Sequence, residues 1–279
     1  MTMRKYVAVI FVFLCVFIYF GVQYNSSKVR IIRVGTECDY VPNNWEENRE
    51  TDSNVPLVNK EGYYAEGYDI QIAKIVADKI GAKLEVKKIA WQDLIPALTR
   101  RDIDAIFSGM LDTEERRKTI SFSEVYEVQA TEYAVIVHKN GKYANAKTLN
   151  DFVNASFTGQ KDTNLYNAID QLPGAIPRTP VDTVSEMLNM LLKHEVDGIV
   201  INVDTGRTYE RAYSDLTMIR FPEGQGFKFD FKGICAGVRK SDTRLLKEIN
   251  SVLSSLSIRD RHRIMDRTVA REWENIQKN

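Results

Sequence analysis

Cysteine and histidine are scarce in this chain of 279 residues, with three of each. No pair of cysteines has the Cys-x-x-Cys spacing of a zinc or redox site, and the histidines lie far apart in the sequence. The sequence therefore predicts no metal site and no disulfide framework, and it indicates no cofactor. The six residues are Cys15, Cys38, Cys235, His138, His194 and His262.

An excess of charge of either sign is also absent, because Lys+Arg and Asp+Glu both number 38. No stripe of basic residues alternates with aromatic ones, so no surface is indicated that would neutralise a phosphate backbone. Nucleic acid is therefore not an expected partner. The hydrophobic share of 44% and the charged share of 27% are those of a globular protein, long enough for one large domain or two compact lobes.

The N-terminus carries an apolar run at 6–22, which follows Arg4 and Lys5 and precedes a polar stretch ending at Lys28. A positive start, an apolar segment and a polar linker are typical of export. Residues 1–28 are therefore predicted to send the rest of the chain to the periplasm or the outer face of the cytoplasmic membrane. Two fates fit them. No small-x-small cleavage site follows, and the run is near the lower limit of about 17 residues for spanning a bilayer, which favours an uncleaved membrane anchor. A cleaved signal peptide is the alternative.

Beyond residue 28, strand and helix patterns alternate. Residues 68–80 place apolar side chains on one helical face and are followed by Gly81, which is typical of a helix and its stop. Short apolar runs on either side are typical of strands. This order predicts an α/β fold with a largely parallel sheet and helices on its faces. The expected strands are 29–35, 83–89 and 103–108, and a second helix is expected at 91–99.

One passage of the sequence occurs twice, as LTRRDIDAIF at 98–107 and as LLKHEVDGIV at 191–200. Both contain a polar turn, an acid, a branched aliphatic residue, an aspartate, a small residue and isoleucine. The repeat predicts two similar lobes with a hinge and a central ligand cleft. Strand-like segments at 133–137 and 233–238 flank the second unit, which predicts that the second lobe is inserted into the first. The predicted lobes are 29–127 with 233–279, and 128–232.

Two features of the first lobe allow more than one interpretation. Residues 43–64 show little periodicity and predict a long loop of the kind that is often functional. Within it, Trp45 and Tyr64 either add a wall to the cleft or pack against the lobe. Cys38 and Cys235 are compatible with one disulfide in an exported protein, but their positions in the sequence do not establish that they lie close together.

The turns after the strands are the expected site, because ligands in open α/β sheets lie at the carboxyl ends of the strands. Glu37 and Tyr40 follow the first strand and are placed to face the cleft, although Glu37 also fits a surface acid. Ser108 and Gly109 follow the third strand, where a glycine lets a ligand approach the backbone.

Arg116 is expected one turn inside a short helix that Asp112 or Thr113 caps. A fixed guanidinium beside free amide groups is a carboxylate receptor, because its planar fork matches two oxygens. Taken alone, an arginine in the charged run 114–118 fits a solvated surface better than a ligand contact.

Four motifs change this balance when they are taken together. In order, they are GTExxYxP at 35–42, GYDIQIAKIVADKIG at 67–81, WQDLIPALTRRDIDAIFSGM at 91–110 and DTEERRKTISFSEVY at 112–126. The chain resembles the bacterial extracellular solute-binding proteins of family 3, the polar amino-acid-binding components of ABC importers, from about residue 30 to 278. The resemblance implies the two-lobed type II periplasmic-binding fold.

The resemblance also implies the contacts of a ligand with the first lobe. The residue that matches Arg116 clasps the ligand's α-carboxylate, and the aromatic at Trp91 stacks on the ligand. Glu37 and Tyr40 face the ligand's side chain, and the region of Gly109 offers backbone groups.

In the second lobe, residues 160–164 (QKDTN) resemble the family's QKGT turn. Thr163 and Asn164 are therefore expected to close on the carboxylate. The family usually has serine or threonine where this chain has Leu111, which can supply only its backbone N–H. The family's ammonium-binding aspartate falls at Asn202, whose amide oxygen accepts a hydrogen bond but carries no charge.

The sequence thus predicts a monomeric binding protein that captures a small polar amino acid or a derivative by lobe closure and delivers it to an ABC permease. It is not expected to be an enzyme. Two alternatives stay open. One is an enzyme like cyclohexadienyl dehydratase on the same fold, which would use a cleft acid such as Glu37 to protonate a leaving hydroxyl. The other is a sensory or scaffolding module.

Overall fold

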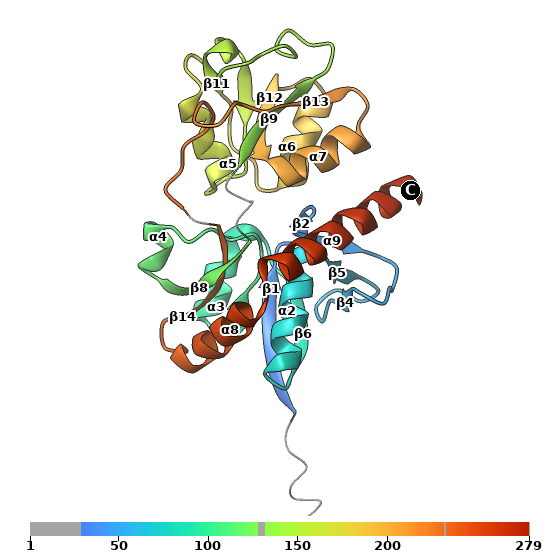
Figure 1. Cartoon of the computed structure of the whole chain (residues 1–279), viewed down its shortest axis with the longest axis vertical. Helices are drawn as coiled ribbons and strands as arrows, with labels where there is room; N and C mark the ends of the chain where they lie inside the picture. Colours follow the sequence, from blue (N-terminus) through green and yellow to red (C-terminus); the bar gives the residue numbers. More distant parts are fainter. Residues whose placement is uncertain (1–28, 128–131, 232, 279) are drawn as a thin grey trace, which may run out of the picture. The chain divides into compact units, whose positions relative to one another are not determined.

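Two five-stranded sheets and a smaller four-stranded sheet make up the strands of the computed structural model, which describes residues 29–127, 132–231 and 233–278, with side chains as far as Arg271 (Figure 1). Ile32–Asn279 forms one compact unit. The predicted export segment, 1–28, lies outside the described residues. Within the part that is described, no helix has the length and apolar character needed to cross a membrane.

The first sheet has the order β6-β1-β7-β14-β8. β1 and β7 run parallel, with Val34 opposite Ala105, whereas β14 is antiparallel to both of its neighbours. The strands predicted from the sequence are all present, although β7 is shorter than the predicted 103–108. In sheet order the bounds are Ala82–Lys88, Arg30–Thr36, Ala105–Ile106, Ile234–Arg239 and Ile120–Glu127.

The second sheet has the order β11-β10-β12-β9-β13. β10 is parallel to β11 and β12, and β9 is antiparallel to β12 and β13. Both sheets are therefore mixed rather than largely parallel. The antiparallel strands β9 and β14 are those that the chain enters directly after passing from one sheet to the other. In sheet order the bounds are Ile176–Pro177, Ser156–Thr158, Gly198–Asn202, Tyr133–His138 and Leu216–Ile219.

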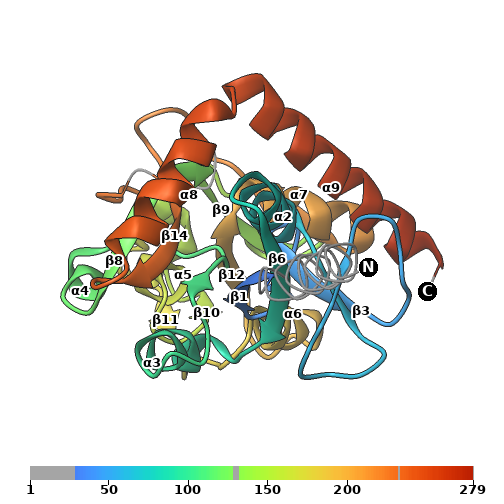
Figure 2. The same cartoon turned by 90° about the horizontal axis from the view of Figure 1, so that it is seen from below.

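Helix α2 (Tyr68–Lys79) confirms the helix predicted at 68–80 and buries one apolar face. Full burial of an aliphatic side chain such as Ile72 stabilises the fold by about 1.5–3 kcal/mol. The helix contacts β6, α8 and α9, as the view in Figure 2 shows. The other helices near the first sheet are η1 (Trp91–Asp93), α3 (Leu94–Thr99), α4 (Glu114–Arg117), α8 (Thr243–Ser255) and α9 (Ile258–Lys278).

The second sheet has its own buried core, in which Phe152, Phe157 and Val200 are fully enclosed. Its helix α6 begins with a capping box, because the Thr183 side chain accepts from the backbone of Glu186 while the Glu186 carboxylate accepts from the backbone of Thr183. The helices here are η3 (Leu149–Phe152), α5 (Asn164–Asn167), η4 (Ala168–Gln171), α6 (Val184–Leu192) and α7 (Val203–Ala212).

The prediction of a loop over 43–64 was wrong in part, because this stretch supplies most of the small sheet, whose order is β2-β3-β5-β4. Its strands contain two to four residues, which is too short for the period-two alternation that marks a strand in sequence. The pairing is nevertheless regular, with Trp45 opposite Glu66. The bounds in sheet order are Asp39–Tyr40, Asn44–Glu47, Tyr64–Glu66 and Val55–Pro56.

The repeated passage adopts the same turn in both places. Arg101 and His194 occupy matching positions after a helix, and both have left-handed backbones, with φ of 68° and 58°. Directly before each strand begins, an aspartate accepts a hydrogen bond from a backbone N–H of the neighbouring strand. Arg33 donates to Oδ2 of Asp104 (3.1 Å), and Ser156 donates to Oδ2 of Asp197 (2.7 Å).

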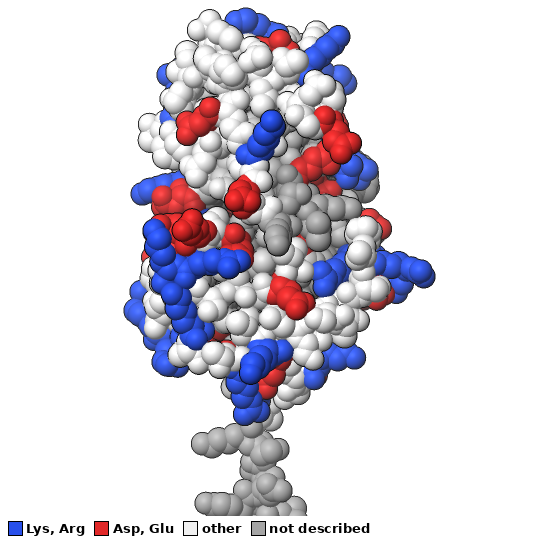
Figure 3. Space-filling view, turned by 60° about the vertical axis from the view of Figure 1, so that its left-hand side comes forward, with Lys and Arg blue, Asp and Glu red and all other residues white. Residues whose placement is uncertain are grey.

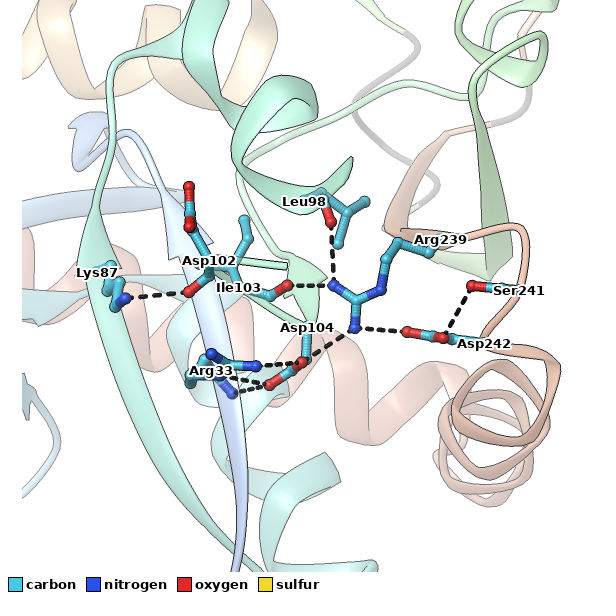
Figure 4. A network of polar contacts seen from close by, with 9 residues as sticks. All are labelled: Arg33, Lys87, Leu98, Asp102, Ile103, Asp104, Arg239, Ser241 and Asp242. Carbon is cyan, nitrogen blue, oxygen red and sulfur yellow. Dashed lines mark hydrogen bonds and ion pairs between the residues drawn. The ribbon is translucent and has the colours of Figure 1, made fainter. Parts of the chain in front are cut away.

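Asp104 has further partners that Asp197 lacks. The Arg33 guanidinium donates to both of its oxygens, at 2.9 Å each, and Arg239 donates to Oδ1 at 3.0 Å (Figure 4). Arg239 also pairs with Asp242 and donates to the backbone oxygen of Leu98. This network ties β1, β7 and β14 together.

Charged side chains of both signs are interspersed on the face shown in Figure 3, in keeping with the even overall count. Cys38 and Cys235 are both buried and both free, so no disulfide joins them.

Candidate ligand-binding site

A cavity that is partly open to solvent lies at the carboxyl ends of β1, β7 and β10. All but one of the ten site residues predicted from the sequence line it, and the exception is Asn202. Those that line it are Glu37, Tyr40, Trp91, Ser108, Gly109, Leu111, Arg116, Thr163 and Asn164. The structure thus brings residues from both five-stranded sheets to one place, while their role as ligand contacts stays a prediction.

Glu37 and Ser108 meet because β1 and β7 are parallel neighbours whose ends lie at the same edge. The backbone N–H of Glu37 donates to the Ser108 hydroxyl at 2.9 Å, which fixes one turn against the other. The Glu37 side chain is only 5% exposed, and its Oε1 accepts a hydrogen bond from Nε2 of Gln160. The carboxyl group therefore contacts the part of the wall that comes from the second sheet.

Burial raises the pKa of Glu37 to about 8. The nearby charge of Asp39 contributes to this rise, while the hydrogen bond from Gln160 and the charge of Lys88 oppose it. A carboxyl group with this pKa is mostly protonated at pH 7. Glu37 therefore presents a neutral acid to the cavity until a cation or a strong donor favours its ionised form.

Gly109 lies beneath the ring of Tyr40 with a left-handed φ of 60°. A Cβ at this position would lie 2.7 Å from the Tyr40 ring, so no larger residue fits without moving that ring. The glycine was predicted to admit a ligand to the backbone. It lines the cavity, but the atom nearest to its missing side chain belongs to Tyr40.

Arg116 lies in α4, whose N-cap is Thr113, as one of the two predicted alternatives required. The Thr113 hydroxyl accepts from the Arg116 backbone N–H at 3.3 Å. The guanidinium donates through Nη1 to the backbone oxygen of Leu111 (2.9 Å) and through Nη2 to that of Asp162 (3.1 Å). Its carbon lies 5.0 Å from the centre of the Trp91 ring, within the range of a cation–π contact.

Desolvation lowers the pKa of Arg116 to about 10, although electrostatic interactions with Tyr133 and Asp162 oppose the fall. The group still carries its charge at neutral pH. Both of its hydrogen bonds go to neutral backbone oxygens, so its charge is held at the cavity without a hydrogen-bonded carboxylate. This arrangement suits an anionic group of a ligand.

The second sheet contributes uncharged groups. The Thr163 hydroxyl caps α5, accepting from the backbone N–H of Leu165 (3.2 Å) and donating to the backbone oxygen of Gln160 (2.7 Å). Tyr133 begins β9, and the ring of Phe229 lies 4.6 Å from its own. Burial raises the pKa of Tyr133, so its hydroxyl is neutral.

Asn202 is the N-cap of α7 and is not among the residues that line the cavity. Its Oδ1 accepts from the backbone N–H of Thr205 at 3.0 Å, and the Thr205 hydroxyl donates to the backbone oxygen of Val41 at 2.6 Å. The amide oxygen expected to receive an ammonium group is thus used to begin a helix. Asp204, the next acid, pairs with Arg207 at 3.0 Å.

Four further residues line the cavity, and none of them was predicted as a site residue from the sequence. Gln160 and Leu165 lie in and next to the QKDTN turn, so the turn itself was the signal. Tyr133 and Ile234 begin β9 and β14, and the strand pattern of those segments gave no sign that their first side chains face a cavity.

Trp45 and Tyr64, for which two interpretations were open, do not line the cavity. Trp45 is 6% exposed, which is the packing alternative. Within residues 29–127, 132–231 and 233–278, no group of three or more His, Cys, Asp or Glu side chains is placed to hold a metal ion.

Comparisons with known proteins identify the family to which the chain belongs. The model of the bacterial extracellular solute-binding proteins, family 3, matches residues 32–265. The arginine-binding extracellular protein ArtP of Bacillus subtilis is 24% identical over 232 residues, which are 83% of this chain and 82% of ArtP. The ABC transporter glutamine-binding protein GlnH of the same organism is 29% identical over 72% of this chain and 71% of its own length.

A solved structure, the substrate-binding protein of an amino acid ABC transporter, is similar with a TM-score of 0.70 and 25% identity. The match covers 85% of this chain and 98% of the other. The predicted two-lobed type II α/β fold is confirmed by this likeness and by the family match over most of the chain. The chain belongs to the bacterial extracellular solute-binding proteins, family 3.

Proposed function

We propose that this protein binds a small amino acid in the cavity between the two five-stranded sheets and delivers it to an ABC permease. The observation that carries the proposal is the Arg116 guanidinium. It lines the cavity, lies over Trp91, and donates hydrogen bonds to two backbone oxygens. An α-carboxylate is the ligand group that would neutralise its positive charge.

The side chain of the ligand is expected to reach Glu37. Arg116 donates to the backbone oxygens of Leu111 and Asp162, whereas Glu37 accepts from Gln160, so the two groups have no hydrogen-bond partner in common. A ligand with a carboxylate at one end and a hydrogen-bond donor at the other satisfies both. Arginine and glutamine, which ArtP and GlnH are named for binding, have this form.

Export and tethering belong to the same proposal. The positive start and apolar run of residues 1–28 support secretion, and the lack of a small-x-small site supports retention as an anchor. The protein would then work as a monomer at the outer face of the membrane, next to its permease, and would bind its ligand without converting it.

A thermal-shift screen tests this function, because a ligand that binds only the folded state raises the melting temperature. The purified protein is heated with each of the common amino acids at about 1 mM. We expect L-arginine or L-glutamine to raise the melting temperature and their carboxylate-free analogues, agmatine and 4-aminobutanamide, to have no effect. No shift with any amino acid would contradict the proposal.

A second function is favoured by one observation, the neutral Glu37 acid in the cavity. A carboxylic acid with a pKa of about 8 is suited to protonate a leaving hydroxyl, as a dehydratase requires. Incubation with prephenate or arogenate, followed by absorbance, tests this. Aromatic product that is formed by the wild type and not by Glu37→Gln would establish the enzyme and displace the binding function.

A further inference from the structure

Asp69 is a buried carboxylate that none of the site contacts above includes. It lies in the first turn of α2 and is 0% exposed. It accepts hydrogen bonds from the backbone N–H of Gly109 (2.7 Å), the hydroxyl of Tyr126 (2.6 Å) and Nδ2 of Asn44 (2.8 Å). The three donors are uncharged and come from three separate parts of the chain.

Two of these donors connect the cavity to the passage between the sheets. Gly109 lines the cavity, and the Tyr40 ring lies where a side chain at position 109 would be. Tyr126 is next to the end of β8, the last strand of the first sheet before the chain enters β9 of the second. The backbone oxygen of Tyr126 also accepts from the hydroxyl of Tyr68, at 2.8 Å, so β8 is held to α2 at two points.

We propose that Asp69 is a positioning residue of the ligand site, which fixes the Gly109 amide and the end of β8 to one another through its two oxygens. The inference rests on the proposed function, because it concerns the same cavity. The inference goes beyond the proposed function, because it names a residue that touches no ligand and yet sets the affinity.

The Asp69 carboxylate accepts all three hydrogen bonds through its two oxygens. Oδ2 accepts from both Gly109 and Asn44, while Oδ1 accepts from Tyr126. An asparagine with its oxygen at the Oδ2 position still accepts from Gly109 and Asn44, and its NH₂ group donates to the Tyr126 hydroxyl, but the negative charge that strengthens all three hydrogen bonds is gone. The variant Asp69→Asn therefore removes the charge while it keeps the size of the side chain.

Protonation of Asp69 weakens it as an acceptor for all three donors. Burial raises its pKa to about 6, although the hydrogen bonds from Tyr126, Asn44 and Gly109 oppose the rise. The other titratable groups that face it are the hydroxyls of Tyr126, Tyr68 and Tyr40, and burial raises the pKa of each. These hydroxyls stay neutral below pH 8, so a change in affinity between pH 7 and pH 5 does not come from their titration.

The test measures two quantities in the full-length protein. The first is hydrogen exchange at the Gly109 amide without ligand. The second is the affinity for L-arginine and L-glutamine at pH 7, and for L-glutamine also at pH 5, because its side chain brings no cation that would ionise Glu37, whose pKa is about 8. The variants are Asp69→Asn, Tyr126→Phe and, as a matched control in the same helix, Asp78→Asn, whose side chain is exposed.

In Asp69→Asn we expect Gly109 exchange to be at least tenfold faster and affinity at pH 7 to fall at least tenfold. The wild type should lose affinity between pH 7 and pH 5, and Asp69→Asn should show no such step. Asp78→Asn should match the wild type. Tyr126→Phe, which keeps the Gly109 bond, should weaken affinity while leaving Gly109 exchange within twofold.

Unchanged Gly109 exchange in Asp69→Asn, or an equal pH step in that variant and the wild type, would overturn the inference. Should Asp69→Asn fail to fold, the ¹⁵N shift of Gly109 in the wild type decides: a titration near pH 6 supports the inference, and a flat profile contradicts it. Failure of both amino acids to bind the wild type would instead contradict the proposed function, because the Gly109 measurements need no ligand.

Discussion

In the first sheet β14 lies between β7 and β8, and in the second sheet β9 lies between β12 and β13, each antiparallel to both neighbours. The turns before β7 and β12 also match, with left-handed residues at Arg101 and His194. The two frameworks are thus built alike. Their contributions to the cavity are not alike, because Glu37 and Arg116, its ionisable acid and base, both come from the first.

This difference separates the part of the sequence that makes the framework from the part that makes the site. The repeated passage belongs to the framework, since Asp104 and Asp197 each accept a hydrogen bond from a backbone N–H of the neighbouring strand. The residues that line the cavity follow the strands and differ between the sheets. We expect the first sheet to hold the charge of a ligand, while the second adds neutral hydrogen bonds and apolar cover.

The largest expected effect is that of Arg116→Ala. Removal of the guanidinium from a desolvated pair with a carboxylate should cost about 3 kcal/mol, which is more than a hundredfold in affinity. Calorimetry with the amino acid identified in the screen measures it. Arg117→Ala is the matched control, because Arg117 is its exposed neighbour and pairs with Asp112. Affinity like that of the wild type in Arg116→Ala would place the ligand's charge elsewhere.

The next effect tests the two aspartates of the repeat. Both donors to Asp197 go to Oδ2, so an asparagine can satisfy them, whereas Asp104 uses both oxygens for Arg33 and Arg239. We expect Asp104→Asn to lower the free energy of unfolding by about 2 kcal/mol and Asp197→Asn by less than about 0.5 kcal/mol. Urea unfolding measures both, and equal losses would contradict the comparison.

Acid should reduce the loss of unfolding free energy that Asp104→Asn causes. Hydrogen bonds from Arg33 and Arg239 hold the pKa of Asp104 below its usual 3.8, against desolvation. A lowered pKa means that the stabilisation is present above about pH 4 and is lost as the pH falls through the folded-state pKa. The gap in unfolding free energy between the wild type and Asp104→Asn should therefore be full at pH 7 and shrink below pH 4. A gap independent of pH would show that the charge of Asp104 is not its cause.

The smallest effect compares two N-caps, Thr113 of α4 and Thr163 of α5, one from each side of the cavity. Each hydroxyl accepts a backbone N–H, so each alanine substitution should cost about 1 kcal/mol of stability, and each serine much less. Thr163 also lines the cavity, so Thr163→Ala should weaken affinity about fivefold, whereas Thr113→Ala should change it less than twofold. Melting curves and calorimetry on the four variants measure this, and a larger affinity loss from Thr113→Ala would reverse the assignment.

Long periodic segments and capped turns were predictable from sequence. Helix α2 was placed to within one residue because its apolar face repeats over three turns and Gly81 ends it. The cap of α4 was predicted at Asp112 or Thr113 from residue type and position, and the structure has it at Thr113. The small sheet was missed because strands of two to four residues are specified by their partners rather than by their own pattern.

The site was predictable where a side chain follows a strand, and less so where its orientation depends on a contact from far away in the sequence. Gln160 was visible as part of a turn, but its contact with Glu37 is made across 123 positions. Asn202 was expected to face an ammonium group, yet its oxygen caps α7. Nothing in a sequence distinguishes a cap from a ligand contact when the residue type suits both.

The contact between Tyr40 and Gly109 has an evolutionary consequence. The ring occupies the space that any side chain at 109 would need, and the left-handed backbone there disfavours a replacement further. A change at 109 is therefore tolerated only in a lineage that has already replaced the ring at 40, so the order of the two substitutions is fixed. Descendants that keep the ring at 40 should therefore also keep Gly109, and a lineage with a large residue at both positions should have rebuilt the turn after β7.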